Sequence, residues 1–489
     1  MSSGIIPPAA EQVLRDLNSW WGPRRGVEPP PPAYRRRTVP EIVERLRGKR
    51  ALIQVFRGPR QTGKTTAVYQ IVEDLVRHNV ARKSILFVRF DLDVLRDAGL
   101  IPIVRWFRET ILGGGERSNR GACLLLDEVH RLPRWDEEVK HLFDTFPVRI
   151  LITGSSSAIV ARGQRESLAG RALNTEFPPF SFREVIEAFN PALAKQLPTP
   201  LRFGHLFDLG PRAGTLFAKL RRVVAARHAE FSQVLERYFQ RGGYPRIYSG
   251  DVDDTVWADY LVETVFDRVL SVDVPELFPV DQPALLRRIY LEVARQTGTE
   301  IAQLRVVEDL SAAGFQTNQP TVGKYLHILA DALLTREFRR YPLARKITAR
   351  VPSKVTLTDI GIRNAVFRTS PSLWKSDPGT LGPLVETLVQ SVIRDRNLQV
   401  HFYRDYTEPG NRHSPVEEVD FVAEALDGST IPIEVKFRKR VDAKDECALR
   451  RFRERFAGPF GLLITRDTFR ADPGDSIICL PLLEFLLAF

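Results

Sequence analysis

The sequence has few cysteines and no long apolar run, and each of these absences excludes a class of protein. Its three cysteines, at positions 123, 447 and 479, lie far apart and are odd in number. A disulfide framework and a cysteine-based zinc site are therefore not expected. No run approaches the roughly 18 apolar residues that span a membrane, and the first residues lack a basic region followed by an apolar core. We expect a cytoplasmic protein that does not associate with membranes.

The composition is that of an ordinary folded protein with a basic excess. The 489 residues are 43% hydrophobic and 27% charged, which is typical of globular proteins, and this length allows several domains. The formal net charge is +11. A basic excess is compatible with binding a polyanion such as DNA, but a solvated basic surface has the same composition. The charge therefore favours nucleic acid only slightly.

The segment from Gly58 to Thr65 fits the phosphate-binding pattern G-x-x-x-x-G-K-[ST]. A strand-like run, residues 51–56, precedes it, and a helix-like run with apolar residues at 68, 71, 72 and 75 follows it. This context predicts a P-loop, whose backbone N–H groups face phosphates at the start of a helix. Lys64 is expected to pair with the β- and γ-phosphates, and the Thr65 hydroxyl to bind Mg²⁺. The predicted nucleotide-binding residues are Gly58, Pro59, Arg60, Gln61, Thr62, Gly63, Lys64, Thr65 and Thr66.

Two acids follow a second apolar strand. Residues 123–126 are apolar and run directly into Asp127 and Glu128, as in a buried parallel strand with carboxylates at its C-terminal edge. Asp127 is expected to hold Mg²⁺, and Glu128 to orient or deprotonate the attacking water. A further strand, residues 149–154, leads into Ser155. Ser155 either caps a helix or senses the γ-phosphate, and its position after the P-loop and the acids favours the sensor role.

Coarse patterns along the chain predict five segments. Residues 1–40 form an extension with a proline-rich stretch, residues 41–190 alternate strand and helix patterns, and residues 191–230 form a helical lid or insertion. Residues 231–349 are helical, and apolar positions 322, 326, 329 and 333 after a proline at 320 resemble a winged helix-turn-helix. Such modules bind DNA or pack against proteins. Residues 350–489 return to α/β patterning.

The last segment has an acidic cluster of its own. Residues 416–426 and 431–437 are strand-like and are joined by an Asp-Gly turn, so Asp420 is expected beside Glu434 and Lys436, which share one strand face. Glu386 lies on the preceding amphipathic helix. The set resembles the PD-(D/E)XK nuclease fold, in which acids bind a divalent metal and the lysine activates water. We expect either a second Mg²⁺ or Mn²⁺ or an internal lysine–carboxylate pair here, and a fold kept for binding without cleavage is the alternative.

Taken together, the motifs resemble a family of bacterial and archaeal P-loop ATPases that join an AAA-type domain to a C-terminal domain of unknown function. The resemblance covers roughly residues 40–480. It rests on these segments in order: GPRQTGKTT (58–66), LDEVHRLPRW (126–135), TGSSS (153–157), LAGR (168–171), PPFSFRE (178–184), GGYP (242–245), LTDIG (357–361), EVDF (418–421) and IEVK (433–436). The N-terminal extension and residues 191–230 look larger than is usual in the family.

The resemblance implies a fold and a set of site residues. The implied fold is α/β, with a RecA/AAA-like parallel sheet, a winged-helix middle domain and a restriction-endonuclease-like C-terminal domain. Arg171 is implied as an arginine finger, acting in cis or from a neighbouring subunit. A structural arginine paired with an acid is the alternative, and Arg162 and Arg165 are rivals for the finger role.

The implied function is Mg²⁺-dependent ATP hydrolysis coupled to DNA binding or remodelling, as in repair, recombination or defence. ATP and Mg²⁺ are the expected cofactors, DNA is the expected partner, and a homo-oligomer is compatible with this class. Two alternatives stay open. One is a signalling or scaffold ATPase that acts on protein partners, and the other is a nuclease gated by ATP.

Overall fold

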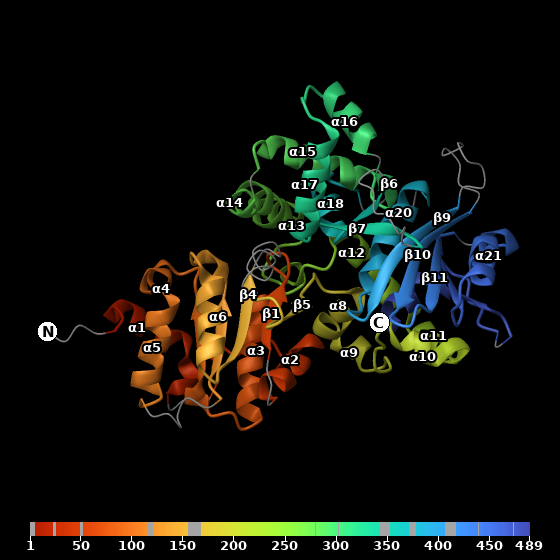
Figure 1. The fold of residues 1–489 in the computed structure, drawn as a ribbon. Helices are drawn as coiled ribbons and strands as arrows, with labels where there is room; N and C mark the ends of the chain where they lie inside the picture. Colours follow the sequence, from red (N-terminus) through yellow and green to blue (C-terminus); the bar gives the residue numbers. More distant parts are fainter. Residues whose placement is uncertain are drawn as a thin grey trace. The chain divides into compact units, whose positions relative to one another are not determined.

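The structure, a computed structural model, describes residues 5–22, 26–48, 52–114, 121–154, 168–278, 280–301, 303–342, 353–370, 378–405, 417–438, 440–472 and 474–489. The chain forms two compact units (Figure 1). Unit 1 comprises residues 1–178, 276–278 and 331–333, and unit 2 comprises residues 179–275, 279–330 and 334–489. Within these described ranges, no helix is long and apolar enough to cross a membrane.

Unit 1 is built on a five-stranded, fully parallel sheet with the order β2-β3-β4-β1-β5. The strands are β1 (Ile53–Arg57), β2 (Ile85–Arg89), β3 (Cys123–Asp127), β4 (Arg149–Gly154) and β5 (Ala172–Glu176). Helices pack on both faces of this sheet (Figure 1). One face carries α2 (Thr38–Arg47) and α3 (Lys64–Arg77), and the other carries α1 (Pro8–Leu17), α4 (Asp93–Ala98), α5 (Leu100–Trp106) and α6 (Trp135–Thr145). The predicted α/β core with a parallel sheet is confirmed.

Alternation along each strand produces two cores in unit 1. In β3, Leu124 and Leu126 pack into the core on one face of the sheet, and Cys123 and Leu125 pack into the core on the other. All four side chains are fully buried. Because both faces of the sheet are covered, β2, β3 and β4 are nearly continuous apolar runs, a pattern that can be recognised in the sequence. The edge strand β5, with the sequence ALNTE, lacks such a run and was not expected from the sequence.

Part of the N-terminal extension covers the open edge of this sheet. β2 is an edge strand. The Asn18 side chain donates to the carbonyl oxygen of Phe87 (2.9 Å) and accepts from its N–H group (2.7 Å). The indole N–H groups of Trp20 and Trp21 donate to the carbonyl oxygen of Ile85, at 3.2 and 2.8 Å. Side chains thus satisfy backbone groups that would otherwise be open to pairing with another strand.

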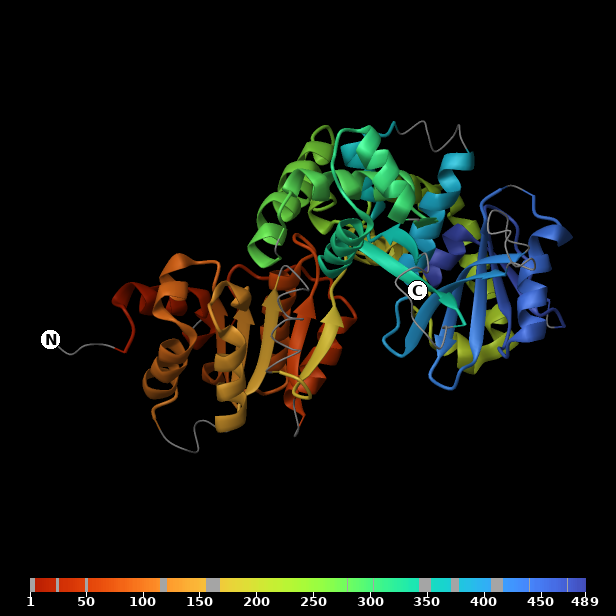
Figure 2. The ribbon, with the colours of Figure 1, turned by 45° about the horizontal axis from the view of Figure 1, so that its top comes forward.

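Unit 2 contains an eight-stranded mixed sheet with the order β13-β12-β11-β10-β9-β7-β8-β6. In Figure 2 the blue strands of its C-terminal part lie side by side. The strands are β6 (Thr299–Ile301), β7 (Thr335–Tyr341), β8 (Ser353–Leu357), β9 (Leu398–Asp405), β10 (Glu417–Ala425), β11 (Thr430–Lys436), β12 (Gly461–Thr465) and β13 (Ile477–Pro481). Strands β10 and β11 pair antiparallel, as the Asp-Gly turn predicted.

The α-helices associated with this sheet lie before, within and after it along the chain. They are α8 (Phe182–Phe189), α9 (Pro191–Ala194), α10 (His205–Leu209), α11 (Ala213–Ala226), α12 (His228–Arg241), α13 (Trp257–Leu261), α14 (Val274–Leu277), α15 (Pro283–Arg295), α16 (Gln303–Ala312), α17 (Gln319–Asp331), α18 (Ile360–Val366), α20 (Pro378–Val392), α21 (Cys447–Arg455) and α22 (Leu482–Ala488). Helix α22 is buried along its whole length. Residues 191–230, expected as a lid or insertion, supply α9, α10 and α11 to unit 2.

Strand β7 joins two parts of this sheet. Its residues 335–338 pair antiparallel with β8, and its residues 339–341 pair parallel with β9. The domain boundary expected between residues 349 and 350 falls between β7 and β8, which are paired with each other. The structure does not separate the chain at that point, because the backbone hydrogen bonds of one sheet connect its two sides.

Two of the sequence motifs, GGYP and LTDIG, interlock in unit 2. The buried Asp359 carboxylate accepts hydrogen bonds from the N–H groups of Gly243 and Gly361, both at 2.7 Å, and burial raises the pKa of Asp359 to about 6. A Cβ atom at Gly242 would lie 2.1 Å from Asp359 Oδ1, and one at Gly361 would lie 2.0 Å from the carbonyl oxygen of Arg241. These close approaches require glycine, so the two motifs hold α12 against α18.

Candidate nucleotide-binding site

The P-loop runs from the end of β1 to the first turn of α3. Gly63 has φ 87° and ψ 23°, a left-handed conformation that favours glycine. A Cβ atom at Gly58 would lie 2.1 Å from the carbonyl oxygen of Phe177, so only glycine fits there. The Thr62 hydroxyl donates to the carbonyl oxygen of Pro59 at 3.0 Å and closes the loop. The loop therefore has the strand–loop–helix geometry that the sequence predicted.

Lys64 is buried at the base of the loop. Its ammonium group donates to the carbonyl oxygens of Gly58 (2.9 Å) and Pro59 (2.7 Å), and only 6% of the residue is exposed. It is the first residue of α3, where the helix dipole also favours an anion. The cationic side chain is thus held at the place where a phosphate would meet the loop.

Thr65 and Asp127 are in direct contact. The Thr65 hydroxyl donates to Asp127 Oδ2 at 2.8 Å, and the Thr153 hydroxyl donates to Asp127 Oδ1. Burial, followed by the charge of Glu128, raises the pKa of Asp127 to about 6. A hydroxyl and a carboxylate side by side are oxygen ligands of the kind that Mg²⁺ prefers, and a nucleotide supplies its remaining contacts in such sites. The residues present therefore fit Mg²⁺.

Glu128 lies beside this pair, at the C-terminal end of β3. Its backbone has φ 53°, an uncommon conformation for a residue other than glycine. Its N–H group donates to the Thr153 hydroxyl at 3.4 Å, and its carboxylate lies 3.5 Å from the His130 ring, between Oε2 and Nε2. Because β1, β3 and β4 are parallel neighbours, their C-terminal ends bring the P-loop, Glu128 and Thr153 to one edge of the sheet.

These groups line one cavity of about 300 Å³ in unit 1. Its lining residues are Arg60, Gln61, Gly63, Lys64, Thr65, Thr66, Arg89, Asp91, Asp127, Glu128 and Arg131. Sequence analysis did not predict the two arginines at 89 and 131. Arg89 lies at the end of β2 and pairs with Asp91 at 2.7 Å. Arg131 lies on the one-turn helix that follows Glu128, and its Nε is buried without a hydrogen-bond partner among the described residues.

The structure does not bring Arg171 to the phosphate loop within one chain. Arg171 directly precedes β5, and its carbonyl oxygen accepts from the N–H of Ile53 at the start of β1. The P-loop follows the other end of β1, about 16 Å away at the usual rise of a strand. Arg171 instead forms a two-pronged ion pair with Asp144, at 2.9 and 3.1 Å. Ser155, Arg162 and Arg165 lie outside the described residues.

The second predicted cluster does come together in unit 2. Lys436 donates to Glu434 Oε1, and Glu434 Oε2 accepts from the N–H of Asp420 at 3.2 Å. A residue that the sequence analysis missed, Lys354 on β8, lies between the remaining acids. Its Nζ is 2.6 Å from Glu386 Oε2 and 3.1 Å from Asp420 Oδ1. No local pattern marks Lys354, because its partners are distant in the sequence.

The residues at this second cluster do not fit the second Mg²⁺ or Mn²⁺ that was considered. An ammonium group already lies between two of the three carboxylates, where a cation ligated by them would have to lie. Across the described ranges, no group of three or more His, Cys, Asp or Glu side chains is placed to hold a metal ion. The internal lysine–carboxylate pairing, the other expected outcome, is what the structure contains.

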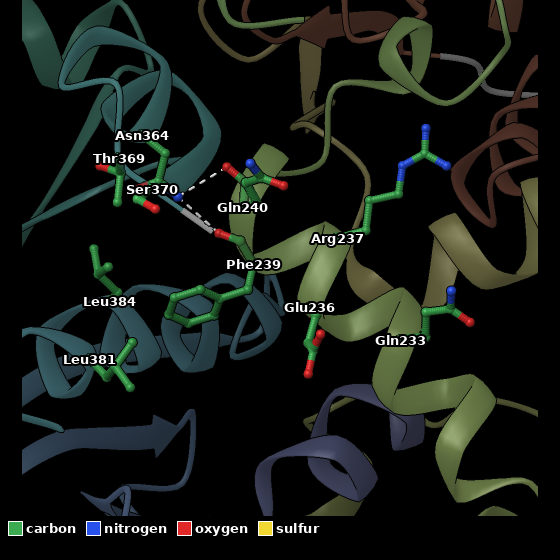
Figure 3. A pocket seen from close by; sticks show the side chains of 10 residues that line it. All are labelled: Gln233, Glu236, Arg237, Phe239, Gln240, Asn364, Thr369, Ser370, Leu381 and Leu384. Carbon is green, nitrogen blue, oxygen red and sulfur yellow. Dashed lines mark hydrogen bonds between the residues drawn. The ribbon is translucent and has the colours of Figure 1, made fainter. Parts of the chain in front are cut away.

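Unit 2 also has a cavity of about 230 Å³ between α12, α18 and α20 (Figure 3). The Asn364 amide donates to the carbonyl oxygens of Phe239 and Gln240, at 2.9 and 3.0 Å, along one wall. Leu381 and Leu384 form an apolar wall beside the Phe239 ring. This mixed lining does not define a ligand.

Comparison with known families identifies the class of the first domain. A family model described as "AAA domain" matches residues 50–186. Two models described as domains of unknown function, DUF8612 and DUF4143, match residues 232–373 and 381–485. The AAA match and the cavity that holds Lys64, Thr65, Asp127 and Glu128 agree. The chain therefore carries an AAA-type P-loop ATPase domain.

Similar curated proteins are themselves uncharacterised. One from Haemophilus influenzae is 22% identical over 314 residues, which cover 64% of this chain and 68% of the relative. One from Methanocaldococcus jannaschii is 24% identical over 58% of this chain and 55% of its own length. One from Mycobacterium tuberculosis is 24% identical over 69% of this chain and 56% of its own length. The chain thus spans little more than half the length of the last two relatives.

Solved structures with a similar course of the chain include two nucleotide-related proteins. A Walker-type ATPase of Pyrococcus abyssi has a TM-score of 0.39 at 15% identity, over 68% of this chain and 95% of that chain. The ORC2 protein of Aeropyrum pernix has a TM-score of 0.35 at 14% identity, over 72% and 97%. At these low TM-scores, neither similarity carries an argument about function.

Proposed function

We propose that the chain hydrolyses ATP with Mg²⁺ and couples hydrolysis to the binding or remodelling of DNA. The observation that supports the chemistry is the convergence of Lys64, Thr65, Asp127 and Glu128 in one cavity at the C-terminal edge of the parallel sheet. Ligands of open α/β sheets bind at this edge. Loop N–H groups, a lysine, an oxygen pair for Mg²⁺ and a second acid beside that pair are the parts that phosphoryl transfer requires.

Each residue has a role in this proposal. The P-loop N–H groups and Lys64 bind and orient the phosphates, so that Lys64 exchanges its carbonyl contacts for phosphate oxygens. Thr65 and Asp127 hold Mg²⁺, which neutralises charge that develops on the phosphates. Glu128 orients the attacking water and accepts its proton. The buried, hydrogen-bonded position of Asp127 leaves Glu128 as the acid that faces the water.

We propose that Arg131, and not Arg171, is the arginine of the same chain that places a positive charge beside the phosphates. Replacing Arg131 by alanine is expected to lower ATP turnover by about 100-fold, because the guanidinium acts on charge that grows in the transition state. Nucleotide affinity should fall much less. Arg134→Ala is the matched control, since Arg134 is exposed three residues away and pairs with Glu137. Steady-state ATPase assays and nucleotide titrations of both variants check this, and equal turnover in the two would remove Arg131 from the site.

The proposed DNA-binding part is a winged helix in unit 2. The elements α15, β6, α16, α17, β7 and β8 follow one another, β6 pairs antiparallel with β8, and β7 and β8 are antiparallel neighbours. In this arrangement α17 is the helix expected to enter a DNA groove and β7 belongs to the wing. Arg336, Arg339 and Arg340 on β7 supply positive charge for the DNA backbone.

If DNA is the partner, its affinity should depend steeply on salt. Each neutralised phosphate contributes a slope of roughly −0.9 in log affinity against log salt on duplex DNA. Arg339→Ala is expected to weaken binding and reduce the slope by about one. Arg396→Ala, an exposed arginine outside the winged-helix elements, should leave both unchanged. The measurement is fluorescence anisotropy on duplex, forked and single-stranded DNA, together with ATPase rates with and without DNA; flat affinity and unstimulated hydrolysis would exclude DNA.

One observation favours a second candidate, an ATPase that acts on protein partners. The exposed charged side chains of α16 and α17 are Arg305, Lys324, Glu308 and Asp309. Their two positive and two negative charges cancel, whereas a pair of helices that reads DNA usually carries a positive net charge. Leu304 at the start of α16 is 55% exposed. If the DNA experiment fails while ATP hydrolysis persists, this candidate takes precedence. A homo-oligomer remains compatible with either function, and it would give Arg171 a neighbouring site to reach.

A further inference from the structure

We infer that the Lys354 ammonium is the built-in cation of the C-terminal carboxylate cluster, and that this cluster binds no divalent metal while Lys354 is present. The cluster consists of Lys354, Glu386, Asp420, Glu434 and Lys436, contributed by β8, α20, β10 and β11. This inference does not depend on the proposed ATPase function, because all five residues lie in unit 2.

Lys354 lies at the centre of the cluster. It is 2% exposed, and its Nζ contacts Glu386 Oε2 at 2.6 Å, Asp420 Oδ1 at 3.1 Å and the Asp420 carbonyl oxygen at 3.3 Å. Its ammonium also lies 4.7 Å from the centre of the Phe421 ring, a favourable cation–π position. A lysine is almost never buried unless its charge is paired. Two hydrogen bonds to Asp420 and a close ion pair with Glu386 thus compensate the charge of this buried lysine.

The carboxylates around it are also engaged. Asp420 Oδ2 accepts from the N–H of Val435 at 2.9 Å, and Glu434 accepts from Lys436 and from the N–H of Asp420. Each carboxylate oxygen of Asp420 therefore already accepts a hydrogen bond, Oδ1 from Lys354 and Oδ2 from the N–H of Val435. A metal ion would have to displace Lys354 from Asp420 and Glu386 and leave its charge unpaired in the interior, which is strongly unfavourable.

Charge supports the same conclusion. Three carboxylates and two ammonium groups form the cluster, so the lysines neutralise most of the negative charge that would otherwise attract a cation. Burial, together with the charge of Asp420, raises the pKa of Glu386 to about 7 and that of Glu434 to about 8.

The two parts of the unit 2 sheet are joined through this lysine. Lys354 belongs to β8, which pairs with β6 and β7 of the proposed winged helix, whereas Asp420 and Glu434 belong to β10 and β11. The internal cation therefore has a structural role across the sheet. It leaves the C-terminal domain without the metal that nuclease chemistry would need, so the wild-type chain should not cleave DNA through this cluster.

The test is Mn²⁺ binding by the nucleotide-free full chain. Lys354→Ala removes the ammonium from between the Glu386 and Asp420 carboxylates, so it is expected to gain one Mn²⁺ between these two acids, with at least about tenfold tighter binding than the wild type. Lys354→Met removes the charge but keeps the space filled, and it should not gain the ion. Asp420→Asn added to Lys354→Ala should abolish the gain. Lys219→Ala, which changes an exposed lysine on α11 of the same unit, is the control and should bind Mn²⁺ as the wild type does.

Electron paramagnetic resonance counts the bound Mn²⁺ ions. Any Mn²⁺ bound at the P-loop is the same in all these variants, because every substitution lies in unit 2, and it therefore cancels in the comparison. A folded Lys354→Ala variant that gains no Mn²⁺ would contradict the inference. A measurement on the wild type keeps the inference testable if the variants do not fold: crystals soaked in Mn²⁺ should show no anomalous density beside Asp420. Density there, or Mn²⁺-dependent DNA cleavage lost in Glu434→Ala, would overturn it.

Discussion

Replacing Lys64 by alanine is expected to abolish ATP hydrolysis and to lower ATP affinity by about 100-fold or more. The lysine is held in the P-loop by the carbonyl oxygens of Gly58 and Pro59, so its ammonium is already positioned for phosphate oxygens. A hydrogen bond to a charged group contributes about 1.5–3 kcal/mol, and losing two of them accounts for this loss of affinity. Isothermal titration with ATP and Mg²⁺ and a phosphate-release assay measure the two effects.

The control for this variant is Lys83→Ala. Lys83 is an exposed lysine in the one-turn helix before β2, so its loss removes the same charge far from the loop. Because Lys64 is buried, the thermal unfolding midpoint of Lys64→Ala must also be compared with the wild type. A folded Lys64→Ala variant that binds and hydrolyses ATP normally would show that the P-loop is not the active site.

Replacing Glu128 by glutamine is expected to lower turnover by about 100- to 10,000-fold, the range that general-base catalysis contributes. ATP affinity should stay close to that of the wild type, because the role proposed for Glu128 is to orient the attacking water and not to bind the phosphates. Glutamine keeps the size of the side chain and its backbone conformation, and it can still contact His130. The variant should therefore accumulate in an ATP-bound form, which single-turnover kinetics and filter binding with labelled ATP detect.

Glu137→Gln is the matched control for this prediction. Glu137 is exposed on α6 and pairs with Arg134, so neutralising it changes the charge by the same amount outside the cavity. Turnover by Glu128→Gln at the rate of this control would assign the base to another residue. Equal losses of affinity and turnover would instead indicate that Glu128 supports nucleotide binding.

The features that the sequence predicted correctly depend on residues close together in the chain. The run before Gly58, the run before Asp127 and the hairpin around the Asp427-Gly428 turn all became strands, β1, β3 and the pair β10 and β11. Periodicity and turn chemistry act within a few residues, so such patterns can be read directly. The P-loop is the same kind of feature, because its strand, glycines, lysine and helix are contiguous.

What the sequence by itself determined, then, is an α/β P-loop domain with a lysine, a threonine and two acids of known chemistry. The tertiary structure alone decided which distant residues meet them. Strand order and parallel direction place Arg171 at the sheet edge opposite the P-loop and Arg131 in the cavity. The sheet of unit 2 likewise brings Lys354 to Asp420, 66 residues further along the chain. These outcomes depend on the packing and pairing of elements far apart in sequence, and no local pattern of side chains encodes them.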